Sequence, residues 1–267
     1  MSGYFDAHLH LQDERLGDAF ELARHMRRAG VEAAVIDATR QSDWNKVHQL
    51  SAWSMGEEVP ELFPAYGIHP WYADTAAEGW LEDLQDYLAT HPSASIGEIG
   101  LDAWIEAPHL DLQRPIFRAQ LELAAQLSKT MSIHCLKAWG PLFEELKACP
   151  PTAPFLMHSY GGSIEFAEQL IPLGAYFSFS GYFLQERKAA AFRVFEQLPM
   201  ERILIETDAP DMTPPIGFVA YPLADGLNHP ANLVAIAEAL AERLGMSPQE
   251  LAQRCTRNAK VCFQILA

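Results

Sequence analysis

Short apolar runs alternate with amphipathic segments along the whole chain, without low-complexity tracts or internal linkers. Short apolar runs predict strands, and the longer amphipathic segments between them predict helices. The predicted strands are residues 3–8, 31–38, 62–68, 94–99, 130–135, 154–158, 175–180 and 202–207. The predicted helices lie near residues 14–29, 43–57, 77–90, 111–128, 139–148, 163–172, 185–197 and 230–244, with a closing pair near 247–265.

Strand and helix alternate about eight times, which is typical of a closed parallel barrel with its helices outside. The competing fold is an open doubly wound sheet, which usually carries a glycine-rich phosphate turn after its first strand. Here that turn is His8-Leu9-His10-Leu11-Gln12. We therefore predict an α/β fold of the TIM (β/α)8 barrel type, in a single domain over residues 1–267.

The first predicted strand carries a pair of histidines. Successive side chains of an extended strand alternate between its faces, so Asp6, His8 and His10 are expected on one side. Neutral imidazole is the commonest metal ligand among side chains, and two imidazoles at this spacing can reach one ion. By itself the pair is as typical of structural histidines as of a metal site.

Four later strands also end in a residue that can bind metal. These residues, from the fourth, fifth, sixth and eighth strands, are Glu98, His134, His158 and Asp208. The C-terminal ends of barrel strands meet at one face, where active sites are built. Burying four imidazoles and two carboxylates there is costly without counter-charge, which divalent cations supply. The alternative is a set of separate histidines that cap individual strands.

The number of ligands predicts two metal ions. Six nitrogen and oxygen ligands exceed what one catalytic zinc ion takes, typically about three plus water. A two-metal site about 3.5–4 Å across, with a bridging carboxylate and a bridging water, uses all six. Glu98 is the expected bridge because its strand lies between the two groups of ligands. The ligand types suit Mg²⁺, Mn²⁺ or Zn²⁺, and the sequence does not choose among them.

Charge and composition narrow the class of protein. A net charge of −16 is the opposite of what a protein that coats nucleic acid through a basic face shows. An enzyme that meets a phosphate through bound cations remains allowed. The chain has no apolar run of about 18 residues, its first strand begins too early for a signal peptide, and its four cysteines lack paired spacing. We therefore expect a cytoplasmic protein with reduced cysteines, no membrane association, and a monomer or weak oligomer.

Several motifs together resemble those of one known family. The chain carries D-x-H-x-H at Asp6–His10, G-x-H-P at Gly67–Pro70, I-G-E-x-G-L-D at Ile96–Asp102, E-T-D-x-P at Glu206–Pro210, N-x-P at Asn228–Pro230, and a terminal helix with N-A at Asn258-Ala259. In this combination, which covers nearly the whole chain, the sequence resembles the TatD family of metal-dependent hydrolases within the amidohydrolase-like superfamily.

The resemblance implies a TIM barrel with two divalent metal ions that hydrolyses phosphodiesters, typically a Mg²⁺- or Mn²⁺-dependent DNase of 3′→5′ exonuclease character. The expected partner is then a small or nucleic-acid substrate, such as a single-stranded DNA end. Carried over to this chain, the resemblance gives one metal the ligands His8, His10, Asp208 and Glu98, gives the second His134, His158 and the same Glu98, and adds His69, Asp102 and Glu206 to the site lining.

Three residues besides the bridge receive expected roles in the reaction. Asp208 is expected to take the proton of the attacking water and to pass it to the leaving group. His69 either donates a hydrogen bond to the reacting oxygen or is a structural histidine before Pro70. Glu206 is expected one strand repeat before Asp208, where it either orients a metal ligand from behind or makes a buried salt bridge.

The substrate rim departs from the family pattern in three segments. They are Leu136-Lys137-Ala138 in place of Arg-Asp-Ala, Ser159-Tyr160-Gly161-Gly162 in place of Cys-Phe-Ser-Gly, and Ala103-Trp104-Ile105-Glu106 in place of an aromatic-basic start. Around this rim we expect substrate contacts from Lys137, Tyr160, Trp71 and Asp102. The lysine would meet a phosphate, and the aromatic rings would stack on bases or simply roof the barrel.

Two other function classes remain open. A metal-dependent deacylase or amidase, acting for example on D-aminoacyl-tRNA or on a small amide or ester, would use the same metals and base at a carbonyl carbon. The third class is a non-catalytic binding or scaffold protein, which the intact ligand set argues against because unpaired buried charges destabilise a fold. We therefore predict a metal-dependent hydrolase acting on ester bonds, with a DNase as the leading function.

Overall fold

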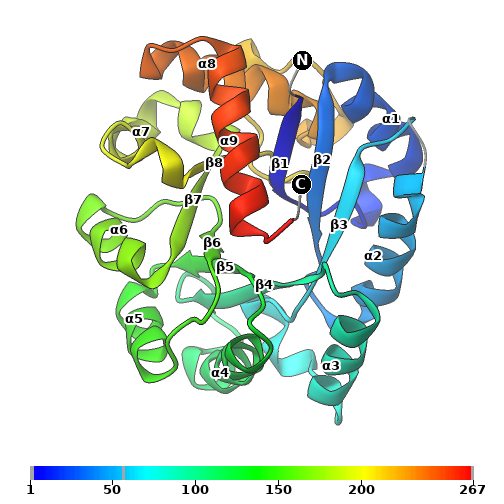
Figure 1. Cartoon of the computed structure of the whole chain (residues 1–267), viewed down its shortest axis with the longest axis vertical. Helices are drawn as coiled ribbons and strands as arrows, with labels where there is room; N and C mark the ends of the chain where they lie inside the picture. The colour runs from blue at the N-terminus through cyan, green and yellow to red at the C-terminus, as the bar shows by residue number, and fades with distance from the viewer. Residues whose placement is uncertain (1–2, 56–57, 266–267) are drawn as a thin grey trace.

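The computed structural model describes residues 3–55 and 58–265, and in this part of the chain eight parallel strands form one sheet in the order β1 to β8 (Figure 1). The strands are β1 (Tyr4–Leu9), β2 (Val31–Asp37), β3 (Glu61–Tyr66), β4 (Ser95–Asp102), β5 (Met131–Leu136), β6 (Phe155–Met157), β7 (Ala175–Ser180) and β8 (Ile203–Glu206). The predicted TIM barrel is confirmed, and the open doubly wound alternative is wrong because the strands follow one another around the sheet in chain order.

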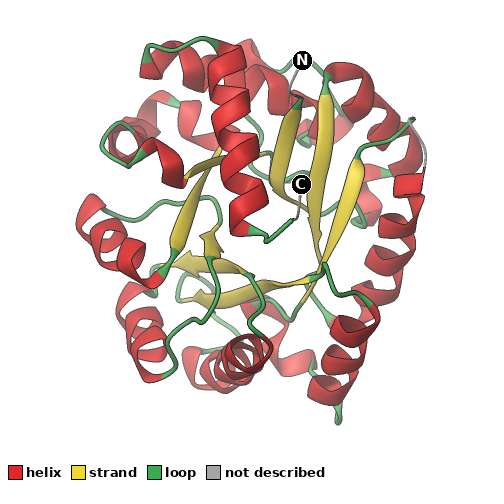
Figure 2. Cartoon of the chain, in the orientation of Figure 1, coloured by secondary structure: helices red, strands yellow, loops and turns green. Residues whose placement is uncertain are grey.

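The α-helices form a layer outside the strands (Figure 2). They are α1 (Ala19–Ala29), α2 (Trp44–Ser51), α3 (Trp80–Thr90), α4 (Leu110–Leu127), α5 (Trp139–Ala148), α6 (Ile164–Leu170), α7 (Ala189–Phe195), α8 (Leu233–Leu244) and α9 (Pro248–Cys262). Across the described part of the chain, none of them combines the length and apolar character that a bilayer span requires.

The first predicted helix, residues 14–29, is divided in the structure. A short 3-10 helix, Glu14–Leu16, precedes α1, which begins after Asp18. The carboxylate of Asp18 accepts the backbone amides of Phe20 (3.0 Å) and Glu21 (3.2 Å), which satisfies two donors at the start of the helix. A capping aspartate inside an amphipathic stretch thus marks a helix start that periodicity alone does not show.

Two other predicted helices differ from the structure. The closing pair expected near 247–265 is the single helix α9, because the chain has no turn between Pro248 and Cys262. The helix expected over 43–57 is α2 followed by a 3-10 helix, Ala52–Met55, and the rest of that range lies outside the described residues.

The first and last strands meet at their C-terminal ends. The backbone amide of Asp208 donates to the carbonyl of His8 (3.0 Å), and the amide of His10 donates to the carbonyl of Ala209 (2.8 Å). Lower down, the buried carboxylate of Asp6 accepts the amide of Thr207 (3.0 Å). Backbone bonding therefore holds the opening histidine pair directly beside Asp208.

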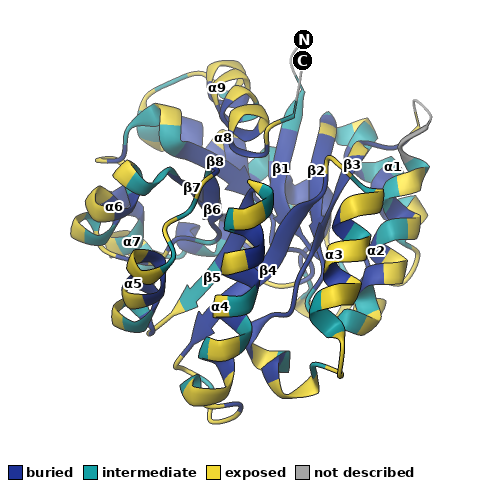
Figure 3. Ribbon diagram, turned by 60° about the horizontal axis from the view of Figure 1, so that its bottom comes forward, coloured by how far each residue is buried: buried dark blue, intermediate teal, exposed yellow. Residues whose placement is uncertain are grey.

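The strands and the inward faces of the helices are buried (Figure 3), and most of the buried residues are apolar. At the N-terminal end of the barrel, Phe5 stacks on Phe63 and on Phe263, with 6.1 Å between ring centroids in each pair. The hydroxyl of Thr130 donates to the carbonyl of Cys262 at the end of α9 (2.7 Å). The terminal helix therefore closes this end of the barrel, and the polar residues gather at the other end.

A buried histidine behind the barrel mouth should make stability depend on pH. Burial, together with the neighbouring His25, lowers the pKa of His229 from 6.5 to about 4. Between about pH 6.5 and pH 4, His229 is protonated in the unfolded chain but neutral in the folded chain. The free energy of unfolding should therefore decrease as the pH falls through this range. The loss should be roughly 1–3 kcal/mol.

Urea unfolding between pH 4 and 7 measures this slope. Asparagine at position 229 can still accept the amide of Ala231, which Nδ1 of His229 accepts at 2.9 Å. His229→Asn should therefore fold and lose the part of the slope that His229 contributes. An unchanged slope in the variant would assign the pH dependence to other groups.

Candidate metal centre

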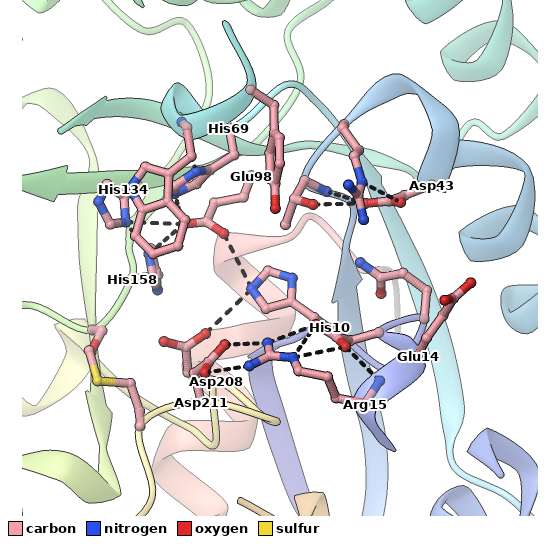
Figure 4. Close-up of a pocket in the computed structure, with 18 of the residues that line it drawn as sticks. His10, Glu14, Arg15, Asp43, His69, Glu98, His134, His158, Asp208 and Asp211 are labelled. Carbon is pink, nitrogen blue, oxygen red and sulfur yellow. Dashed lines mark hydrogen bonds and ion pairs between the residues drawn. The ribbon is translucent and has the colours of Figure 1, made fainter. Parts of the chain in front are cut away.

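A cavity of about 900 Å³ opens at the C-terminal ends of the strands (Figure 4). Five of the six predicted metal ligands line it: His10, Glu98, His134, His158 and Asp208. The sixth, His8, is fully buried at its floor, with Nε2 3.3 Å from Nε2 of His10. The structure therefore brings together all six residues that the strand ends predicted.

His8 and His10 are both held by their outer ring nitrogens. Nδ1 of His8 lies 2.8 Å from the hydroxyl of Ser132 and 3.0 Å from a carboxylate oxygen of Asp37. Nδ1 of His10 lies 2.7 Å from the backbone carbonyl of Asp37, to which it donates. Because hydrogens occupy the outer nitrogens, the lone pairs on both Nε2 atoms face the centre of the cluster.

The carboxylate of Glu98 divides the ligands into two groups. Oε2 lies 3.5 Å from Nε2 of His8 and 3.3 Å from Nε2 of His10. Oε1 faces the other way, 3.2 Å from Nδ1 of His134 and 2.7 Å from Nε2 of His158. One carboxylate therefore stands between two pairs of imidazoles, with one oxygen toward each pair.

The second pair is positioned by β4 and by residues behind it. Gly100 of β4 lies so close to β5 that a side chain there would overlap the carbonyl oxygen of His134. Nε2 of His134 lies 3.2 Å from the carboxylate of Asp102, and Nδ1 of His158 lies 3.7 Å from Oε1 of Glu206. The other oxygen of Glu206 accepts the hydroxyl of Ser178.

The cluster attracts positive charge. Burial disfavours an imidazolium at His8, but the nearby carboxylate of Asp37 outweighs it and the pKa of His8 is raised to about 9. Burial also disfavours charge on Glu98, yet the imidazoles of His69 and His158 hold the pKa of its carboxyl well below the usual range. The carboxylates thus create a field that holds positive charge at this site, whether as protons or as metal ions.

The ligand set fits divalent cations. Two inward lone pairs, on His8 and His10, lie 3.3 Å apart and face the oxygens of Glu98 and of Asp208, which is 3.4 Å from Nε2 of His10. Electron pairs at such distances repel each other unless a positive charge lies among them. Imidazole nitrogen and carboxylate oxygen together suit Zn²⁺ and Mn²⁺, and carboxylates also suit Mg²⁺.

The ring of His69 lies between the backbone amide of Trp71 and the carboxylate of Glu98. Its Nδ1 accepts the backbone amide of Trp71 (3.1 Å), so in the neutral ring Nε2 carries the hydrogen and donates it to Oε1 of Glu98 (3.2 Å). Burial lowers the pKa of His69 to about 4, although Glu98 opposes the shift, which keeps the ring neutral. In this structure the hydrogen on Nε2 of His69 is therefore directed at Glu98, where it orients the carboxylate.

Tyr160 and Asp102 were expected at the substrate and lie elsewhere. The ring of Tyr160 is 1% exposed and its hydroxyl donates to the carbonyl of Ser163 (2.7 Å), so it belongs to the core. The carboxylate of Asp102 is buried and accepts the amide of Trp104 (2.7 Å) besides facing His134. Both assignments to substrate contact are corrected: the tyrosine packs, and the aspartate holds a ligand.

Trp71 and Lys137 stand at the mouth in different ways. Trp71 lines the cavity, is 49% exposed, and donates from Nε1 to the carboxylate of Asp102 (2.6 Å), so its ring has an accessible face. Lys137 is exposed outside the cavity lining, with Nζ 3.8 Å from the ring centroid of Trp104. A contact between this lysine and a bound phosphate requires it to leave that ring.

The sequence reasoning missed several residues that support the ligands. Asp37 and Ser132 bracket His8. Asp6, which was expected on the same side of its strand as the two histidines, binds Thr207. Asp37 ends β2, so the strand-end criterion that found the other ligands also applies to it. Nothing in the sequence indicates the role of Ser132, because it is a small polar residue inside a largely apolar strand.

A closed barrel with buried imidazoles and carboxylates gathered at its C-terminal mouth defines a metal-dependent hydrolase. The chain belongs to the TatD family of these enzymes: the family model for TatD related DNase matches residues 5–264. This confirms the family resemblance predicted from the motifs.

Several relatives match the chain over nearly its full length. YabD of Bacillus subtilis (strain 168), named an uncharacterized metal-dependent hydrolase, is 31% identical over 264 residues, which are 98% of this chain and 99% of that protein. The 3′-5′ ssDNA/RNA exonuclease TatD of Edwardsiella piscicida is 27% identical over 252 residues, 93% of this chain and 94% of that protein. The crystal structure of YjjV, a TatD homolog from Escherichia coli K12, superposes with a TM-score of 0.87 at 26% identity and covers 98% of each chain.

Proposed function

We propose that this protein is a two-metal phosphodiesterase that removes nucleotides from the 3′ end of single-stranded DNA or RNA. The observation that carries the proposal is the division of ligands by Glu98, whose Oε2 faces His8 and His10 while its Oε1 faces His134 and His158. A carboxylate with one oxygen toward each of two imidazole pairs is the arrangement expected of a bridge between two cations.

Each half of the cluster would hold one divalent ion. His8, His10 and Asp208 would hold the first with Oε2 of Glu98, and His134 and His158 would hold the second with Oε1. When bound, such ions supply Lewis acidity, which makes a water easier to deprotonate and offsets negative charge on a phosphate.

Asp208 is the proposed proton acceptor. It lines the cavity with Oδ1 3.4 Å from Nε2 of His10, and its backbone is fixed by the bond from its amide to the carbonyl of His8 (3.0 Å). Burial raises the pKa of its carboxyl, but the neighbouring imidazoles of His10, His158 and His8 together outweigh burial, so the net shift is downward. The carboxylate is therefore ionised at neutral pH and can take a proton from an attacking water.

The shape and charge of the mouth support a chain end as substrate. A cavity of about 900 Å³ is at the upper end of the range for small ligands and accommodates a terminal nucleotide. The guanidinium of Arg15 is paired with Asp13 (2.8 Å) and Asp211 (2.7 Å), and Arg40 is paired with Asp43 (3.2 Å). Because these cations are already neutralised, the mouth offers little to a long polyanion, and the phosphate must be met mainly at the metal cluster.

Because the arginines at the mouth are paired with carboxylates, the site also suits a second candidate function, that of a metal-dependent deacylase or amidase. A substrate with a neutral amide or ester would meet the same Asp208 and the same cluster, without needing a cationic groove. The two functions differ in the atom attacked, phosphorus in one case and a carbonyl carbon in the other.

The test is a substrate comparison with protein loaded with Mn²⁺ or Mg²⁺. Oligonucleotides of DNA and RNA labelled at the 5′ end should give a ladder of products shortened from the 3′ end, and duplex DNA should be cut more slowly. Aminoacyl-tRNA and small amide or ester substrates should remain intact. Turnover of these substrates with intact oligonucleotides would replace the nuclease by the deacylase.

Lys46 offers the cavity a cation that is free to meet a phosphate. It lines the cavity, and within residues 3–55 and 58–265 it has no ion-pair partner. Lys46→Ala should raise KM for an oligonucleotide about two- to fivefold, because an exposed ion pair contributes roughly 0.2–1 kcal/mol. The slope of log KM against log salt should decrease by about 0.7.

Lys137→Ala is the matched comparison, since it removes an exposed lysine that lies outside the cavity on the ring of Trp104. We expect a smaller effect on KM and on the salt slope from this variant. The opposite order of effects would restore Lys137 as the phosphate contact predicted from the sequence.

A further inference from the structure

Asp37, the last residue of β2, contacts both histidines of the opening pair. Its backbone carbonyl accepts Nδ1 of His10 (2.7 Å) and the side-chain amide of Gln12 (2.7 Å). Its carboxylate Oδ2 lies 3.0 Å from Nδ1 of His8. One residue on a neighbouring strand therefore reaches the outer nitrogen of each imidazole.

The carboxylate of Asp37 is buried without the usual partners of a buried charge. The side chain is fully buried, and among the described residues neither of its oxygens has a hydrogen-bond partner of good geometry. Nδ1 of His8 instead directs its hydrogen bond to the hydroxyl of Ser132 (2.8 Å). Within the described chain no lysine or arginine lies within ion-pair distance of Asp37, so the nearest positive charge must come through His8.

The backbone of β4 packs closely against this carboxylate. Gly97 of β4 lies against it, and a side chain at that position would overlap Oδ1 of Asp37 and come within 2.8 Å of Cβ of Ser132. An unpaired buried carboxylate costs free energy in a folded protein. A cation bound to Nε2 of His8 offsets this cost. The carboxylate then interacts with the positive charge of the cation through the imidazole between them.

We propose that Asp37 is a positioning residue for the ion held by His8 and His10. Its carbonyl fixes the ring of His10, and its carboxylate supplies negative charge behind His8 and so strengthens the binding of a divalent cation at Nε2 of that ring. The inference rests on the proposed metal cluster, in which a buried carboxylate then stands behind one ligand of each half: Asp37 behind His8, and Asp102 behind His134.

A purely structural role for Asp37 makes a different prediction about stability. The hydroxyl of Ser132 lies 2.8 Å from the same Nδ1 of His8 and can accept its hydrogen when the carboxylate is removed. If its charge serves the cation, removal should weaken the metal-bound protein more than the metal-free protein. If it serves the fold, removal should destabilise both forms equally.

The experiment is a titration of metal-free Asp37→Asn with Mn²⁺, followed by electron paramagnetic resonance and by thermal unfolding. We expect one of two sites to lose about 10- to 100-fold in affinity, as for other groups behind a metal ligand, while the second site keeps its affinity. The signal of a spin-coupled pair should then appear only at higher Mn²⁺ concentration. The rise in Tm on adding Mn²⁺ should be smaller for the variant than for the wild-type protein.

Two comparison variants make the result specific. Ser132→Ala removes the hydroxyl beside His8 and keeps the charge, so it should lose less affinity than Asp37→Asn. Asp37→Val keeps the backbone carbonyl and gives the same comparison if the asparagine variant does not fold. Wild-type affinities at both sites, or equal losses of Tm with and without Mn²⁺, would overturn the role of Asp37. Wild-type protein that binds no Mn²⁺ would instead overturn the proposed cluster.

Discussion

Glu98→Gln is expected to release metal from both halves of the cluster and to abolish hydrolysis. The substitution keeps the shape of the side chain and removes the charge that both imidazole pairs face, at 3.3 Å for His10 and 2.7 Å for His158. Removing one partner of a buried charged group typically costs about 3–5 kcal/mol. If that loss falls on the transition state, the rate drops by roughly 10²- to 10⁴-fold. Metal analysis after dialysis and kcat/KM for an oligonucleotide measure the two effects.

Glu145→Gln is a matched control for loss of a buried carboxylate. Glu145 of α5 is fully buried, like Glu98, but its partners are Arg114 (2.7 Å) and Arg118 (2.6 Å), away from the cavity. This variant should be less stable and should keep both metal ions and its activity in the folded fraction. A Glu98→Gln protein that retains two tightly bound ions would show that Glu98 is not the bridge.

Asp208→Asn is expected to lower kcat by roughly 10²- to 10⁴-fold with KM little changed, because asparagine keeps a coordinating oxygen but cannot accept a proton. The backbone bond from residue 208 to the carbonyl of His8 does not involve the side chain, so the local fold should persist. Steady-state kinetics on a single-stranded oligonucleotide, with metal content measured in parallel, separate the loss of the base from the loss of a ligand.

The neighbouring Asp211→Asn controls for a change of charge at the cavity. Asp211 also lines the cavity, but its carboxylate binds Arg15 (2.7 Å) and is not among the cluster ligands. We expect kcat within a few-fold of wild type for this variant. A loss in Asp208→Asn that appears only as higher KM, or only with loss of metal, would remove the proton-accepting role.

The barrel and the six ligands were predictable because both depend on strand periodicity. Glu98 lies within β4, His134 within β5 and Asp208 just after β8, and in a parallel barrel the C-terminal parts of the strands meet at one face. The pairing of β1 with β2 shifts register between Asp6 and Leu9, which a strict alternation of faces cannot anticipate. This is why the prediction held for the two histidines and failed for Asp6.

The supporting groups and the rim were less predictable, because their roles depend on partners distant in sequence. The carboxylate of Asp102 contacts His134, 32 residues away in the sequence, and the hydroxyl of Ser132 contacts His8, 124 residues away. Tyr160 was placed at the rim from its position after β6, but its ring turns into the core toward Phe177, with 4.7 Å between centroids. A residue that follows a strand end can point into the cavity or under it, and packing decides which.

The number of divalent ions bound by each chain tests the account most directly. Metal-free protein saturated with Mn²⁺, passed over a desalting column and assayed for metal and protein should hold two ions per chain. The Glu98→Gln variant should hold none under the same conditions. A saturated wild-type protein with a single ion, or with none, would contradict the division of ligands between the two oxygens of Glu98 on which the proposed function rests.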